Sequence, residues 1–80
     1  MAQTESMAEL LPGEKGVVEK LCNENSIKRR LQDIGLVKGT IVECVGISPL
    51  GDPAAYLIRG AVIAIRNEDS GLVKIKTEGN

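Results

Sequence analysis

The side chains in this chain that could do chemistry are few and scattered. The 80 residues contain two cysteines, Cys22 and Cys44, and no histidine. A cysteine nucleophile needs a partner base, which is usually histidine, and a structural zinc site needs closely spaced Cys or His ligands. The sequence therefore predicts no catalytic centre and no metal centre. Both cysteines are expected to be small, buried, apolar residues.

The carboxylates that stand out, Asp52, Glu68 and Asp69, lie in expected turns. Acidic side chains in turns usually cap backbone donors or face water. No serine lies in a G-x-S-x-G setting, and the chain has no G-x-x-x-x-G-K-[ST] phosphate loop. We therefore expect a protein that is not an enzyme and that binds no cofactor.

Composition limits the kinds of partner further. The formal net charge is −1, and Tyr56 is the only aromatic residue. Single-stranded nucleic acid is bound through aromatic stacking platforms, so the basic run Lys28-Arg29-Arg30 is interpreted as a solvated helix face, and no nucleic-acid partner is expected. The chain has no apolar run of transmembrane length, and its opening residues lack the apolar core of a signal peptide. These features predict a cytoplasmic protein without direct membrane insertion.

One stretch, residues 26–35, has clear helical periodicity. Ile27, Leu31 and Ile34 fall on one face, and Gly35 follows as the expected left-handed C-cap. Leu31 is predicted to be a core residue. Arg30 flanks the apolar stripe, so it is expected to be structural, with its guanidinium on loop carbonyls or on a carboxylate.

The rest of the chain has the pattern of short strands and turns. Glycines mark the turns after the helix, at Gly39, and between the last strands, at Gly60. The predicted strand at residues 41–47 has apolar residues on both faces, so we expect it to be partly covered twice, by the sheet and by the helix. The alternation of residues 15–22 is imperfect, and a bulge near Gly16 is one explanation for it. The strands are predicted at residues 15–22, 41–47, 55–59, 62–66 and 72–77.

Together these elements predict a mainly β fold, a small five-stranded barrel with one short helix. The domain is expected to cover residues 10–77. Residues 1–9 are expected to form a flexible N-terminal tail, and residues 78–80 a C-terminal tail.

The loop at residues 49–53 has two interpretations. Pro49, Gly51 and Pro53 predict a stiff turn between two strands. A loop that is already ordered loses little entropy on binding, so it could also be a docking loop, with Leu50 and Asp52 as its contact residues. Further contact candidates lie on the exposed side of the helix, namely Lys28 and Arg29.

The order of these motifs resembles the family of ferrous iron transport protein A. The matching pieces are Pro12-Gly13, the pattern R-R-L-x-x-I-G-L-x-x-G at residues 29–39, the loop at residues 49–53, and Gly60 followed by Ile-Ala-Ile-Arg at residues 63–66. The resemblance covers about Leu10 to Ile75. It implies an SH3-like barrel with one helix.

The resemblance also implies a function. The family supplies a small cytoplasmic accessory to ferrous iron transport protein B, a membrane permease with a GTP-binding domain. The same fold occurs as the C-terminal domain of iron- or manganese-dependent transcriptional repressors. The alternative is therefore a stand-alone regulatory domain that senses a metal or binds another protein. Because no helix-turn-helix pattern precedes the predicted barrel, the accessory role is favoured.

Overall fold

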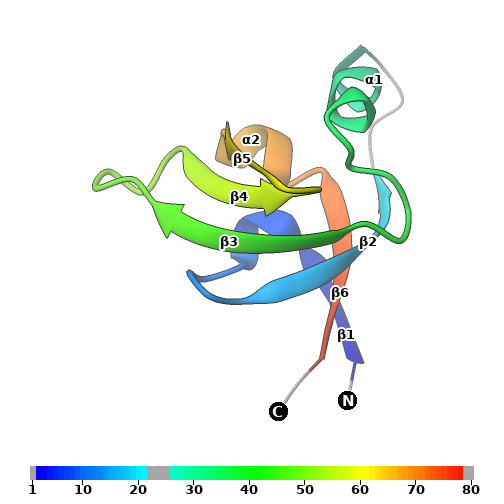
Figure 1. The fold of residues 1–80 in the computed structure, drawn as a ribbon, viewed down its shortest axis with the longest axis horizontal. Helices are drawn as coiled ribbons and strands as arrows, with labels where there is room; N and C mark the ends of the chain where they lie inside the picture. Colours follow the sequence, from blue (N-terminus) through cyan, green and yellow to red (C-terminus); the bar gives the residue numbers. More distant parts are fainter. Residues whose placement is uncertain (1, 22–25, 79–80) are drawn as a thin grey trace.

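The computed structural model describes residues 2–21 and 26–78, and within them six antiparallel strands form one sheet of order β1-β6-β2-β3-β4-β5 (Figure 1). The strands are β1 Ala2–Ser6, β2 Lys15–Leu21, β3 Ile41–Ile47, β4 Ala54–Ile58, β5 Ala61–Ile65 and β6 Val73–Glu78. The helices are η1 Met7–Glu9, a 3-10 helix, α1 Ser26–Asp33 and α2 Asn67–Ser70. The mainly β prediction with a short helix is confirmed, but the sheet has six strands rather than five. The five predicted strands agree with β2 to β6 to within one residue at each end.

The N-terminal segment corrects the prediction of a flexible tail over residues 1–9. Residues 2–6 form β1, which pairs with β6 from Ala2↔Glu78 to Ser6↔Lys74. Glu78 therefore belongs to a strand and not to a tail. Met7, at the start of η1, is fully buried, and its carbonyl accepts a hydrogen bond of 3.3 Å from the hydroxyl of Tyr56. The start of the chain thus closes the core.

The core consists of alternate residues from the curved sheet together with residues of and beside η1. In β4 the burial alternates strictly, as expected for a strand with one covered face. The helices η1 and α2 lie next to each other against this core. The fully buried side chains are those of Met7, Leu10, Val18, Leu36, Val42, Cys44, Tyr56, Ile58, Ser70, Val73 and Ile75.

Gly16 serves close packing and does not mark the bulge that was expected near it. The register shift in β2 lies between Val18 and Lys20, where the strand pairs with β6. Gly16 itself pairs regularly with Val42. A Cβ at this position would lie 2.6 Å from Cδ1 of Ile75, a fully buried side chain with little room to move. Glycine therefore allows β6 to pack its core residue against the backbone of β2.

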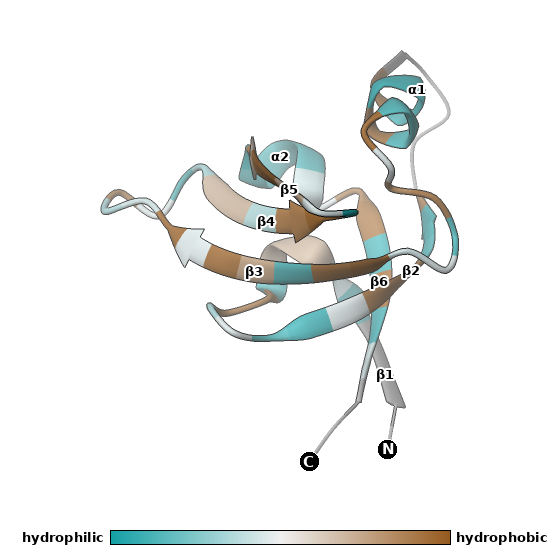
Figure 2. Cartoon of the chain, in the orientation of Figure 1, coloured by the Kyte–Doolittle hydropathy of each residue, from teal (hydrophilic) through white to brown (hydrophobic). Residues whose placement is uncertain are grey.

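The outer face of β3 is open, which corrects the expectation that sheet and helix cover both faces. Val42 and Cys44 are fully buried, whereas Ile41, Val45 and Ile47 are 62%, 42% and 42% exposed. Figure 2 shows hydrophobic residues along this strand. α1 does not reach this face, because it stands beyond the end of the sheet (Figure 1).

The end of α1 has the two hydrogen bonds of a Schellman motif. The amide of Leu36 donates to the carbonyl of Leu31 over 3.1 Å, and that of Gly35 donates to the carbonyl of Gln32 over 3.0 Å. Gly35 has a φ of 108°, a conformation that other residues rarely adopt. A Cβ at Gly35 would also lie 2.6 Å from Cδ of Arg59, in the turn between β4 and β5. The helix therefore stops where it meets this hairpin.

The apolar stripe of the helix faces the sheet. Leu31 is buried, at 3% exposed, and the half-buried Ile27 and Ile34 pack against the same core. Leu31 therefore anchors α1 to the sheet, while its neighbours leave space beside it.

The turn glycines Gly39 and Gly60 have positive φ angles of 92° and 87°.

Candidate partner-binding surfaces

The loop between β3 and β4 is ordered by its own backbone and exposes one large apolar side chain. The amide of Ser48 donates to the carbonyl of Pro53 over 3.1 Å, and that of Gly51 donates to the carbonyl of Ser48 over 2.8 Å. Pro49 restricts the same turn through its fixed φ. At its tip Leu50 is 94% exposed. A large apolar side chain held out on a rigid loop suits a contact with another protein.

Asp52 has a structural role that the sequence does not reveal. Its Oδ1 accepts a hydrogen bond of 2.9 Å from the backbone amide of Asn67, the first residue of α2. The side-chain amide of Asn67 donates in return to the carbonyl of Gly51 over 3.1 Å. Asp52 thus acts as a cap from 15 residues away, at a helix end where Arg66 gives no side-chain cap. Its proposed contact with a partner stays a prediction.

The basic residues of the helix are separate from this loop. Arg29 is exposed and Lys28 is half-buried on α1. Figure 1 shows α1 at one end of the sheet and the loop between β3 and β4 at the opposite end. The structure therefore does not bring the two predicted contact sites together.

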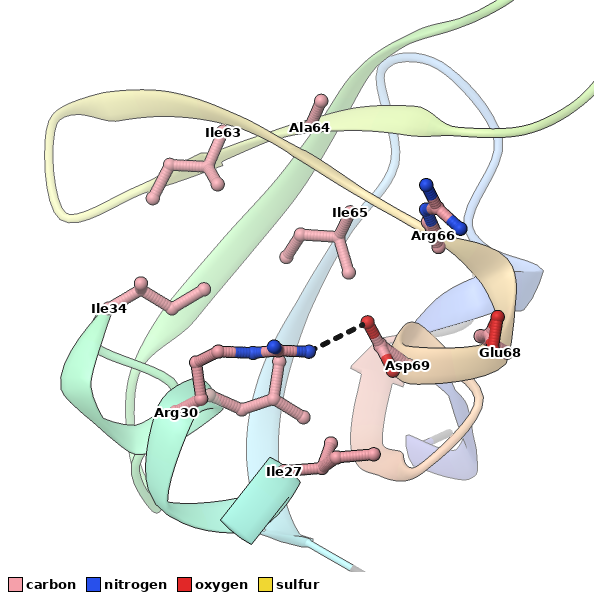
Figure 3. A pocket seen from close by; sticks show the side chains of 10 residues that line it. Ile27, Arg30, Ile34, Ile63, Ala64, Ile65, Arg66, Glu68 and Asp69 are labelled. Atoms are coloured by element: carbon pink, nitrogen blue, oxygen red, sulfur yellow. Dashed lines mark ion pairs between the residues drawn. The ribbon is translucent and has the colours of Figure 1, made fainter.

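A third surface, which the sequence did not suggest, is a groove of about 580 Å³ between α1, β5 and α2 (Figure 3). Its walls are mostly branched apolar side chains, and its rim carries two cations and two carboxylates. The apolar lining comes from Ile27, Leu31, Ile34, Ile63, Ala64 and Ile65. The rim residues are Arg30, Arg66, Glu68 and Asp69.

One ion pair crosses the rim of this groove. Arg30 reaches from α1 to Asp69 on α2, with a distance of 3.6 Å between Nη2 and Oδ2 (Figure 3). The side chain of Arg30 is 69% exposed, and an ion pair of this kind contributes about 0–1 kcal/mol. The buried Leu31 therefore does more than this pair to hold α1. The structure places Arg30 against a carboxylate, one of the two partners considered for it.

No pattern in the sequence indicated that Ile63, Arg66 and Glu68 would share a site with the helix. Residues 62–66 have the pattern of a strand, and that pattern says nothing about which element stands beside its free edge. The position of α1 depends on the turn that follows Gly35. Such a tertiary relation has no local signal.

Two buried polar side chains, those of Tyr56 and Ser70, have hydrogen-bond partners, whereas the buried hydroxyl of Ser48 has none in the described part of the chain. Burial raises the pKa of Tyr56 above its ordinary value of 10.0, and a hydrogen bond with Ser70 acts in the opposite direction. Cys44 is a buried free thiol whose Sγ lies 3.7 Å from the carbonyl oxygen of Gly46, while Cys22 lies outside the described residues. In the described part of the chain, no three His, Cys, Asp or Glu residues are grouped so that they could hold a metal ion. That part also holds no helix of the length and apolarity that a membrane span requires.

Comparison with known proteins identifies the family. The model of the FeoA domain matches residues 5–77. This chain belongs to the FeoA family. A solved FeoA from Stenotrophomonas maltophilia, described as an SH3 domain protein and complexed with zinc, has 28% identity and a TM-score of 0.78. The match covers 88% of this chain and 87% of that one. The SH3-like fold is therefore shown.

Two further relatives are a FeoA-like protein and a protein in which a FeoA part is fused to FeoB. A FeoA-like protein from Clostridium acetobutylicum has 25% identity and a TM-score of 0.90, over 100% of this chain and 93% of that one. A protein from Porphyromonas gingivalis, described as a fusion of Fe(2+) transport protein A with the Fe(2+) transporter FeoB, has 26% identity over 70 residues. That match covers 88% of this chain but only 8% of the fusion protein.

The FeoA fold also occurs in regulators. A manganese-dependent transcriptional repressor has a TM-score of 0.84 at 11% identity, over 94% of this chain and 37% of that one. At this identity the likeness concerns the fold alone.

Proposed function

We propose that this chain supports ferrous iron uptake as a small cytoplasmic accessory protein that binds the cytoplasmic part of the ferrous iron permease, FeoB. The observation that carries the proposal is the fusion relative, in which a FeoA part and FeoB are one polypeptide. Parts joined in one chain stay at high effective concentration, so a weak contact between them is sufficient. A separate FeoA chain would use the same contact as a free protein at the inner face of the membrane.

The contact itself is proposed to involve Leu50. This side chain is 94% exposed on a loop that internal hydrogen bonds already order. Binding would bury the leucine without the entropic cost of ordering the loop. Complete burial of a leucine side chain contributes about 1.5–3 kcal/mol. Leu50 is therefore the residue whose change is expected to weaken binding most.

The basic side of α1 is proposed as a second contact. Arg29 is exposed there and Lys28 is half-buried. Charges at the rim of an interface mainly raise the rate of association, and salt screens them. We therefore expect a transient interface whose affinity falls as the salt concentration rises.

The repressor-like role is less well supported. It rests on a likeness of fold at 11% identity, whereas the accessory role rests on family membership over residues 5–77. No second function is proposed.

The test is a titration of fluorescently labelled protein with the soluble domain of FeoB and with complete FeoB in detergent. Leu50→Asp is expected to weaken binding by about tenfold or more, because it puts a charge where an apolar side chain becomes buried. The double variant Lys28→Glu/Arg29→Glu is expected to slow association and to remove most of the salt dependence.

Matched controls separate these sites from general effects of charge. Leu11→Asp changes another exposed leucine, which is 59% exposed, and Lys15→Glu/Lys38→Glu reverses two exposed lysines outside α1. Both controls should bind normally, and all variants should keep the melting midpoint of the unmodified protein. The proposal fails if the unmodified protein binds neither form of FeoB at any salt concentration.

A further inference from the structure

The free edge of β5 faces the groove. Among the described residues β5 pairs only with β4, from Ala61↔Ile58 to Ile65↔Ala54. The turn between them has two residues, Arg59 and Gly60, with φ angles of 51° and 87°. In such a hairpin the closing pair is hydrogen-bonded, and the following pairs alternate.

This alternation fixes which backbone groups of β5 point away from β4. They belong to Val62 and Ala64, whose partners Leu57 and Ala55 form the non-hydrogen-bonded pairs. The edge therefore offers an amide and a carbonyl at each of these two residues. Such a row of groups is a template for another strand.

The groove runs along this edge. Three consecutive residues of β5 line it, Ile63, Ala64 and Ile65, although neighbouring side chains of a strand point to opposite faces. A surface that meets all three must therefore follow the edge of the strand, where the backbone lies. Figure 3 shows α1 across the groove from this strand, with Ile27 and Ile34 on the helix side.

We propose that the groove takes one extended segment of a partner protein. This segment adds to β5 as a further strand, hydrogen-bonds to Val62 and Ala64, and places alternate apolar side chains between β5 and α1. Addition of a strand at an open edge is a common way to bind a peptide, because the backbone gives affinity and the neighbouring pocket gives specificity.

The charges of the rim indicate the chemistry of this segment. The two arginines, Arg30 and Arg66, are balanced by Glu68 and Asp69. Since the rim has no net charge, it cannot select a strongly charged peptide. The apolar walls of the groove then determine which peptide binds. The segment is therefore an uncharged strand with an apolar residue at every second position, and its binding should change little with salt.

A second copy of this chain fits the edge poorly. Pairing of β5 with β5 would bring the second copy's own α1 to the same edge, where α1 of the first copy already stands (Figure 3). A single strand without a folded domain attached avoids this clash. The inference goes beyond the FeoB contact proposed above, since neither Leu50 nor the pair Lys28 and Arg29 lines the groove.

The test is an amide-shift titration of isotope-labelled protein with a capped peptide of alternating valine and threonine. Shifts should be confined to β5, α1 and α2, and the affinity should be the same at low and high salt. Ala64→Pro should weaken binding by about tenfold, because proline removes an amide that points away from β4 and that only the peptide uses. Ala61→Thr changes an exposed residue of the same strand that does not line the groove, and it should bind normally.

A second measurement covers the case in which Ala64→Pro does not fold. The same peptide with methylated backbone amides in its central residues should not bind the unmodified protein, because it cannot form the strand pairing. The proposal is overturned if the methylated peptide binds equally well, if a folded Ala64→Pro variant binds normally, or if the peptide does not bind. Shifts along β1 instead of β5, or a dimer of the free protein that covers β5, would overturn it as well.

Discussion

Tyr56 is the largest fully buried side chain and the only aromatic one. Its hydroxyl donates to the carbonyl of Met7, so it ties the middle of the sheet to the N-terminal segment. Burial disfavours the charged phenolate and therefore raises the pKa of Tyr56 above 10.0. The folded protein keeps this proton to a higher pH than the unfolded chain does.

Because the pKa of Tyr56 differs between the folded and unfolded states, the stability of the protein depends on pH in the alkaline range. Below pH 10.0 both states hold the proton, and the phenol then gives its full contribution to stability. Above pH 10.0 the unfolded chain loses the proton first, so the free energy of unfolding falls as the pH rises towards the folded pKa. Urea unfolding in a pH series should show this fall, and Tyr56→Phe should reduce it.

The ultraviolet absorbance of phenolate reports this group alone, because the chain has one tyrosine. All other side chains are the same in the unmodified protein and in Tyr56→Phe, so their effects on stability cancel in the comparison. Equal slopes of stability against pH for the two proteins would show that burial of Tyr56 does not couple to folding.

Single residues differed in how far the sequence could predict their place. Leu31 and Gly35 could be placed from the period of the helix and from its stop signal, both of which are local. The capping role of Asp52 could not be predicted, because the amide that it accepts belongs to Asn67. The hairpin of β4 and β5 lies between these two residues in the sequence, and only its three-dimensional structure brings them together.

At the level of elements, the end of α1 can be tested through two glycines. Gly35 and Gly39 both have positive φ angles, 108° and 92°, but a Cβ meets a neighbour only at Gly35. Gly39→Ala should therefore cost only backbone strain, about 1–3 kcal/mol, and Gly35→Ala should cost more because it also displaces Arg59. Chemical unfolding of both variants measures the difference.

A double-mutant cycle isolates the steric part of this difference. Arg59→Ala removes the Cγ and Cδ atoms that lie within 3.3 Å of the added Cβ. In this background, the cost of Gly35→Ala should approach that of Gly39→Ala. If Gly35→Ala lowers the free energy of unfolding equally with and without the Arg59 side chain, the close approach of helix and hairpin does not contribute to this cost.

The elements that the sequence predicted are those with a local pattern. The five strands β2 to β6 carry runs of branched apolar residues, and the hairpin turn carries its glycine. β1, Ala2–Ser6, has no such pattern, since its sequence is Ala-Gln-Thr-Glu-Ser. It is a strand because β6 offers an edge to pair with, and pairing at a distance cannot be predicted from one alanine and four polar residues.

For the whole molecule, the apolar core should stabilise the fold without a metal and without a disulfide. Cys44 is free and fully buried, and the described residues contain no cluster of possible metal ligands. Thermal unfolding should therefore be cooperative, with the same midpoint when a chelator, a reductant or neither is present. Any group that binds only the folded state would raise the midpoint, so a clear drop on adding chelator would reveal a metal that stabilises the fold.

The pairing of β1 with β6 determines how this domain would respond to a mechanical load. Because Ala2 lies opposite Glu78, the two ends of the described chain leave the sheet at the same end (Figure 1). A pull on both ends would act across one pair of residues at a time and would unzip β1 from β6, instead of shearing the whole ladder at once. Met7 follows directly after β1, so it would leave the core next and break the hydrogen bond from Tyr56. Under tension, the domain would thus open from the segment that closes its core.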